Sequence, residues 1–158
     1  MDKTLDAMYR ELLSRIHREI LKPAGFKKEG GNFRLCHDTG LCKIVNFQRS
    51  MYNDQAECKF AINVGLYFQK DVRAPNLRFK ECDCPIRQRA AWFSPRYGSD
   101  LWCCIFEGRD MESLYCEVRT ILTEDVLPWM TRFESRQDVI RAGQNGLLKG
   151  MIWGNISF

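Results

Sequence analysis

Two runs of alternating apolar and polar residues, 41–50 (LCKIVNFQRS) and 58–68 (CKFAINVGLYF), constrain the fold of this chain more than any other feature. Side chains on a strand point alternately to the two faces of a sheet, so a period of two is typical of half-buried strands. A short polar loop separates the two runs, which are therefore predicted to pair as an antiparallel hairpin. In the predicted register Phe47 lies opposite Ile62, and Val45 lies opposite Val64.

This hairpin is expected to have one apolar face, suited to a layer of helices, and one face of different character. On that second face Asn46 is predicted to lie opposite Asn63, with Gln48 and Tyr67 on the same side. Amides both donate and accept hydrogen bonds, and small residues beside them leave room for a ligand or a partner. An ordinary solvated sheet face is the simpler alternative, because antiparallel sheets commonly keep one face in water.

The first part of the chain predicts a helix and one more strand. Apolar residues at spacings of three and four indicate an amphipathic helix over residues 5–21. Pro23 and Gly25 are expected to end it, since proline cannot continue a helix and glycine readily adopts a left-handed conformation. A short strand at 32–36 then joins the hairpin and makes a three-stranded antiparallel meander.

Residues 69–100 show no sustained period, but two elements are predicted at the end of this region and just after it. Pro85 suits the first turn of a helix that would run to Trp92. The apolar run 101–106 (LWCCIF) has strand length and is expected to be the fourth strand of the sheet.

Two further helices are predicted from their capping residues. Asp110 is a good N-cap for a long helix that begins at Met111, and Pro128 is expected to kink or restart that helix. Ser135 and Asp138 have the spacing of a capping box, which indicates a last short helix.

These elements predict a single α+β domain over residues 1–142, with an antiparallel sheet of about four strands. The first helix and the long helix from Met111 are expected to cover one face of the sheet. The remaining tail, 143–158, is apolar and punctuated by glycines. It is predicted to form a hairpin or an extended arm that packs on its own domain or on a second copy, so a homodimer through the tail is one expectation.

Composition narrows the class of protein. The chain has 158 residues, 45% hydrophobic and 28% charged, with a net charge of +4, which is typical of a globular domain in solution. We find no apolar run of the roughly 20 residues that a membrane span needs and no signal peptide, so a cytoplasmic location is expected. The eight cysteines lack the paired spacing of zinc ligands and are predicted to be free thiols. No metal and no cofactor are expected.

Candidate binding residues cluster around Arg87 and Arg89, whose planar guanidinium groups can hold a phosphate or a carboxylate. Trp92 and Tyr97 follow them closely in sequence and would add aromatic surface. The alternative is that both arginines are solvated or paired with the acidic residues just before them. No histidine lies in a nucleophile motif, and no catalytic residue is predicted.

Six segments taken in order resemble one known family. They are GFKKEGGNFRL, KIVNFQRS, FAINVGLYF, CPIRQR, LWCCIF and VLPWMTRFES. Their succession resembles the bacterial domain-of-unknown-function family 4304, over residues 5–140 of this chain. The resemblance implies a cytosolic bacterial α+β domain with no assigned activity, and the tail lies outside it.

For function, the leading interpretation is a non-enzymatic module that presents the polar sheet face and the arginine-bearing segment to a protein partner, in an immunity-like or regulatory role. The alternative is a small enzyme or binding protein that recognises a phosphorylated or carboxylated metabolite through Arg87 and Arg89. A nucleic-acid binder ranks third, because no RNA-binding signature accompanies the aromatic residues.

Overall fold

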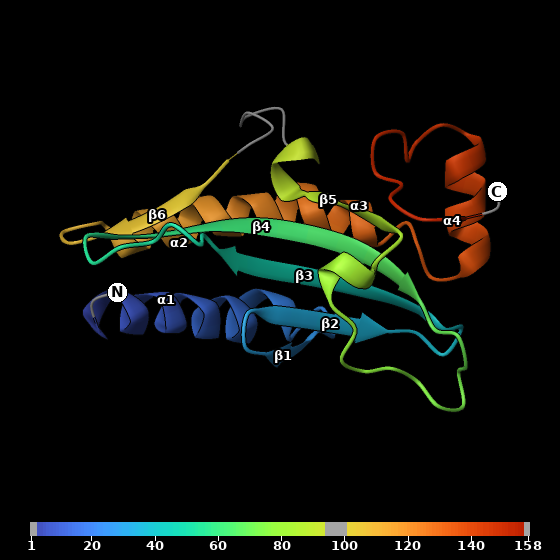
Figure 1. The fold of residues 1–158 in the computed structure, drawn as a ribbon, viewed down its shortest axis with the longest axis horizontal. Helices are drawn as coiled ribbons and strands as arrows, with labels where there is room; N and C mark the ends of the chain where they lie inside the picture. The colour runs from blue at the N-terminus through green and yellow to red at the C-terminus, as the bar shows by residue number, and fades with distance from the viewer. Residues whose placement is uncertain (1–2, 94–100, 157–158) are drawn as a thin grey trace.

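The computed structural model describes residues 3–93 and 101–156 as one antiparallel sheet with helices on one face. In Figure 1 helix α1 (blue) and helix α2 (orange) run along the length of the sheet, and α4 (red) stands at its end. This architecture confirms the predicted α+β class. The sheet has six strands, somewhat more than the four expected.

The strands follow the order β1-β2-β3-β4-β5, and β6 pairs with β4 along the same edge as β5. Their bounds are β1 Lys27–Glu29, β2 Asn32–Cys36, β3 Leu41–Arg49, β4 Glu57–Phe68, β5 Ile86–Arg89 and β6 Cys103–Phe106.

The predicted register of the central hairpin is confirmed. Phe47 pairs with Ile62, and Asn46 pairs with Asn63. The alternating apolar side chains that include Val45, Phe47, Ile62 and Val64 therefore share one face, where they are buried beneath the helices. The alternation was decisive here, because a slip of one residue would have exposed every apolar side chain of the strand.

The helices also follow their sequence signals. Helix α1, Lys3–Ile16, continues as a π-helical turn, His17–Leu21, up to the predicted end. Helix α2, Met111–Thr120, is capped by Asp110, whose carboxylate accepts hydrogen bonds from the backbone N–H groups of Glu112 and Ser113.

The helical path beyond α2 runs through a π-helical segment, Ile121–Val126, into the short helix α3, Leu127–Met130. Pro128 lies at the start of α3, where the π-helical segment gives way to an α-helical turn. The capping box of Ser135 and Asp138 opens helix α4, Arg136–Gln144, as predicted.

The helix predicted between Pro85 and Trp92 is wrong. Residues Ile86–Arg89 form strand β5, and a 3-10 turn, Ala90–Phe93, follows it. The edge of β4 offers unpaired backbone groups to this segment, with Leu66 opposite Ile86. Pairing with β4 thus outweighed the local preference for a helix, which rested on a single proline, Pro85.

The prediction that all eight cysteines are free is wrong for one pair. Cys36 and Cys42 face each other across the β2–β3 hairpin and are joined by a disulfide bond. The remaining six cysteines are free thiols, of which Cys58, Cys84 and Cys103 are buried.

The tail contacts its own domain along the outer edge of β5. The N–H of Arg87 donates to the carbonyl of Met151, and the N–H of Trp153 donates to the carbonyl of Pro85, at 2.9 and 2.7 Å. Met151 is buried, and Ile152 forms a bridge with Ile86.

Candidate functional site

The polar face of the sheet is divided by the segment 69–84, which crosses it (Figure 1). The ring of Phe79 on this segment stacks on Tyr67, with 4.5 Å between the ring centroids. Cys84 lies on Gly65 so closely that a Cβ added to the glycine would meet its Sγ at 2.7 Å. Together with Ile44, these side chains form a small second core, and Tyr67 lies under this cover rather than on open surface.

The amides on the other part of this face bond to one another. Asn46 donates to the side-chain oxygen of Asn32 at 2.8 Å, and Asn63 donates to those of Asn46 and Gln48 at 3.2 and 2.9 Å. Asn63 is 5% exposed, so these bonds satisfy a buried amide. The amides therefore form a ladder across β2, β3 and β4 that fixes the polar surface.

Arg87 and Arg89 extend this polar surface onto β5. Arg89 lies opposite Asn63, and Arg87 lies opposite Gly65, so both side chains are on the polar face. A helix would have turned them about 200° apart, at 3.6 residues per turn. The strand that the sequence did not predict is therefore the element that brings the two predicted arginines together.

The two arginines, the amides and the tail line an open hollow of about 220 Å³. Its lining residues are Gln48, Asn63, Glu81, Arg87, Gln88, Arg89 and Trp153. Pockets that hold drug-sized ligands measure about 300–1,000 Å³. This hollow is smaller and suits a single side chain or a small anion.

Glu81 places a negative charge beside the two guanidinium groups. Its Oε1 lies 3.9 Å from Nε of Arg87, and the Nη1 of Arg87 donates to the carbonyl of Cys82. Burial raises the pKa of Glu81 and outweighs the opposite effect of Arg87 and Arg89. The carboxylate is thus held near the arginines in a partly desolvated place.

Each arginine also lies against a tryptophan. The guanidinium carbon of Arg87 is 5.4 Å from the ring centroid of Trp153, and that of Arg89 is 4.6 Å from the ring of Trp102. These distances are within the range of cation–π attraction. Trp153 is 63% exposed, and its indole N–H donates to the carbonyl of Arg87 at 3.1 Å.

The structure places Trp92 outside the lining of this hollow. Trp92 is half exposed and lies against Gly150 of the tail. Tyr97 lies outside the described residues. Sequence reasoning missed Trp153, because it left open whether the tail packs on its own domain or on a second copy. The spaced glycines and apolar residues of the tail gave no sequence signal that it would pack along β5.

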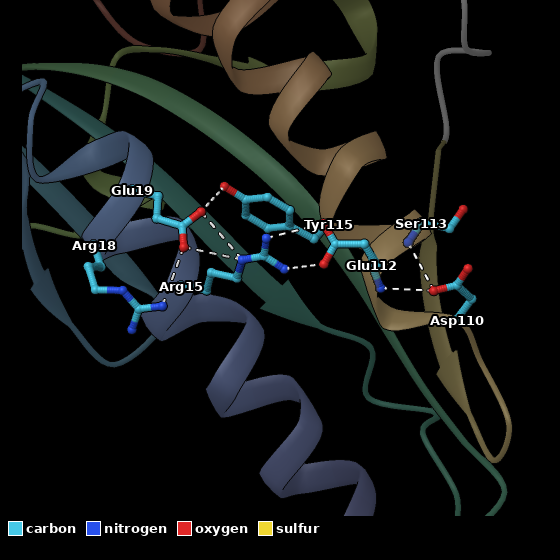
Figure 2. Close-up of polar contacts among 7 residues, drawn as sticks. All are labelled: Arg15, Arg18, Glu19, Asp110, Glu112, Ser113 and Tyr115. Atoms are coloured by element: carbon cyan, nitrogen blue, oxygen red, sulfur yellow. Dashed lines mark hydrogen bonds and ion pairs between the residues drawn. The ribbon is translucent and has the colours of Figure 1, made fainter.

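A second hollow, about 350 Å³ and mostly apolar, lies between the helices α1 and α2. Its lining residues are Ala7, Met8, Glu11, Leu12, Arg15, Met111 and Tyr115. Figure 2 shows a polar network at this place, in which the guanidinium of Arg15 lies 3.6 Å from the Tyr115 ring centroid and bonds to Glu112 at 2.5 Å.

This network is satisfied within the chain. The Tyr115 hydroxyl donates to Glu19 at 2.5 Å, a bond that lowers the pKa of Glu19, and Arg15 lowers the pKa of Glu112. Arg15 also contacts Glu19 at 3.3 Å. The network therefore ties α1 to α2, and its charges are already paired with each other.

Among the described residues no group of three or more His, Cys, Asp or Glu side chains is placed to hold a metal ion. In the same part of the chain, no helix has the length and apolar character needed to cross a membrane.

Fold and site together define a class: an α+β domain whose sheet is covered by helices on one face and carries an arginine-lined hollow on the other. The family model described as "Domain of unknown function (DUF4304)" matches residues 17–132, and the chain belongs to this family. The matched span includes Arg87 and Arg89 but not Trp153. Comparison with the curated proteins and with the solved structures gave no match.

Proposed function

We propose that the protein is a non-enzymatic binding module that recognises a protein partner through the hollow on the polar sheet face. The observation that carries this proposal is the pairing of Arg87 and Arg89 with two tryptophans at one surface. Arginine and tryptophan are among the residues that dominate binding energy at protein interfaces. Here both arginines are held on a strand, so little order has to be gained on binding.

The surroundings of the hollow favour a macromolecular partner. Ile152 and Trp153 are large, apolar and exposed, and they extend the surface beyond the hollow along β5. An interface needs such an apolar area around its polar anchors. The hollow alone is too small to bury most of a metabolite.

The second candidate is a binding protein or small enzyme for a phosphorylated or carboxylated metabolite. Two guanidinium groups that face one hollow favour this candidate, because planar guanidinium groups hold such anions by paired hydrogen bonds. A homodimer through the tail would place a second copy at the same surface.

We further propose a bacterial, cytoplasmic setting and an immunity-like or regulatory role. The support for this setting is the family resemblance, and the support for a regulatory role is the small hollow without a catalytic set of residues among those described.

The test is capture from the native host with immobilised full-length protein, followed by mass spectrometry. A specific partner should be retained by the wild type and lost from Arg87→Ala and Trp153→Ala. Arg119→Ala is the matched control, since Arg119 is exposed on α2 in the other layer, and it should retain the partner. The proposal fails if no protein shows this pattern while a metabolite raises the melting temperature of the wild type but not of Arg87→Ala.

A further inference from the structure

The guanidinium of Arg87 has two hydrogen-bond donors, on Nε and Nη2, that the nearby carboxylate of Glu81 does not reach. Its Nη1 donates to the carbonyl of Cys82. Within residues 3–93 and 101–156, no hydrogen-bond acceptor is bonded to its Nε or Nη2. The nearest acid, Glu81, lies 3.9 Å from Nε, whereas an N–H···O hydrogen bond spans about 2.7–3.2 Å. The Nε and Nη2 edge is one that a carboxylate engages with both oxygens.

The backbone of Glu81 is fixed by the turn that carries it. The 3-10 turn Glu81–Asp83 is closed by the N–H of Cys84, which donates to the Glu81 carbonyl at 3.0 Å. The Asp83 carboxylate accepts from the N–H of Lys80 at 2.7 Å. Because Cys84 is seated on Gly65, the turn is fixed to the sheet at its far end.

We infer that the group recognised by Arg87 is a carboxylate, supplied by an Asp or Glu side chain of the partner, and that Glu81 is a built-in competitor for it. This inference rests on the proposed function. The hollow is the size of one side chain, and the free edge of Arg87 matches the two oxygens of one carboxylate.

The charge of Glu81 selects between carboxylate and phosphate. Glu81 repels any anion that approaches Arg87, and Coulomb repulsion scales with the charge of that anion. The attraction to Arg87 and Arg89 scales in the same way, so the sum of the three charges, about +1, decides the preference. A carboxylate neutralises this charge, whereas a phosphate, with about −1.5 to −2 charges near pH 7, leaves uncompensated negative charge in a partly desolvated hollow. The site should therefore prefer the singly charged group, at the cost of some affinity.

The experiment is an NMR titration of the purified full-length protein, which follows the Nε–H signal of Arg87. The probes are a capped Gly-Glu-Gly tripeptide, its Gly-Gln-Gly counterpart and inorganic phosphate. The glutamate peptide should shift the signal and bind at least three-fold tighter to Glu81→Gln than to the wild type. The glutamine peptide should give no shift.

Glu11→Gln is the control, because it makes the same change in net charge on an exposed residue of α1 and should leave the affinity unchanged. Phosphate should bind more weakly than the glutamate peptide in the wild type and gain more than the peptide in Glu81→Gln. Equal affinity of the peptide for wild type and Glu81→Gln, or tighter binding of phosphate than of peptide to the wild type, overturns the inference. Glu81→Ala repeats the comparison if Glu81→Gln does not fold.

The two proposals can fail separately. If a captured partner depends on Arg87 but the glutamate peptide binds no variant, the carboxylate inference is refuted and the binding module stands. If the peptide binds as expected but no captured protein depends on Arg87, the protein-binding function is refuted and carboxylate recognition stands.

Discussion

Replacement of Gly65 by alanine tests whether the Glu81 turn is seated on the sheet. Gly65 is central in β4, and its φ is not positive, so backbone conformation does not require a glycine there. The close approach of Cys84 does require one. An added Cβ would lie 2.7 Å from Sγ and 2.9 Å from Cβ of Cys84, and 3.1 Å from a methyl carbon of Ile44.

The magnitude follows from two opposing effects. Forcing an extra methyl group into a filled site costs about 1–3 kcal/mol of unfolding free energy. Alanine in place of glycine in a strand returns about 0.5–1 kcal/mol, because the unfolded chain loses conformational freedom. Gly65→Ala should therefore destabilise the protein by about 1 kcal/mol, the middle of the resulting range. Because the displaced turn carries the competing Glu81, a carboxylate should bind at Arg87 more tightly than in the wild type.

The assay is urea denaturation of the wild type, Gly65→Ala, Cys84→Ala and the double variant. Removal of Sγ relieves the closest contact, so the double variant should be more stable than the sum of the single changes predicts, by about 1 kcal/mol. If Gly65→Ala is as stable as the wild type or more stable, Cys84 does not lie on the sheet, and the argument for a fixed Glu81 turn is refuted.

Three further predictions concern the core and its buried charges. Ile62→Ala should cost about 2–4 kcal/mol in denaturant melts, because it opens a cavity under the helices, while Asn63→Ala on the opposite face should cost only about 1 kcal/mol; equal losses would contradict the assignment of faces. Lys43 is 4% exposed, and burial lowers its pKa. Lys43→Met removes this buried charge and should raise the urea midpoint of unfolding. A lower midpoint would show that the charge is well compensated in the folded protein. Burial and the charge of Lys43 lower the pKa of His37. Below about pH 6.5 the unfolded chain therefore binds more protons than the folded protein, and stability should fall. His37→Gln should flatten the dependence of unfolding free energy on pH between about pH 7 and 5, and an unchanged dependence would exclude His37 as its source.

The elements that the sequence predicted well are those whose signal is local and repeated. The alternation of β3 and β4 extends over many residues, so it determined the register as well as the strand type. The N-caps Asp110 and Ser135 act within one turn of helix, and both form the predicted hydrogen bonds. Such signals depend little on the rest of the fold.

The elements that it did not predict depend on distant parts of the chain. Strand β5 has only four residues, too few for a period to be distinguished, and it exists because β4 offers a free edge. The disulfide between Cys36 and Cys42 depends on the exact opposition of two residues across a turn. The glycine at position 65 looked like open space for a ligand, because the residue that fills this space, Cys84, lies 19 positions away.

The candidate site combines residues from the sheet with one residue from the tail, and these two parts can vary independently in sequence. Arg87, Glu81 and the amides lie within residues 17–132, the span that the family model matches, whereas Trp153 lies in the tail outside it. The charged part of the hollow is therefore built on the shared sheet. An apolar wall is supplied by the tail, which is held by the buried side chains of Leu148 and Met151 and by two backbone hydrogen bonds near β5. Under the proposed function the guanidinium of Arg87 would recognise charge and the exposed ring of Trp153 would recognise apolar surface. A change in the tail should then alter which partner is accepted without altering the anion that Arg87 would bind.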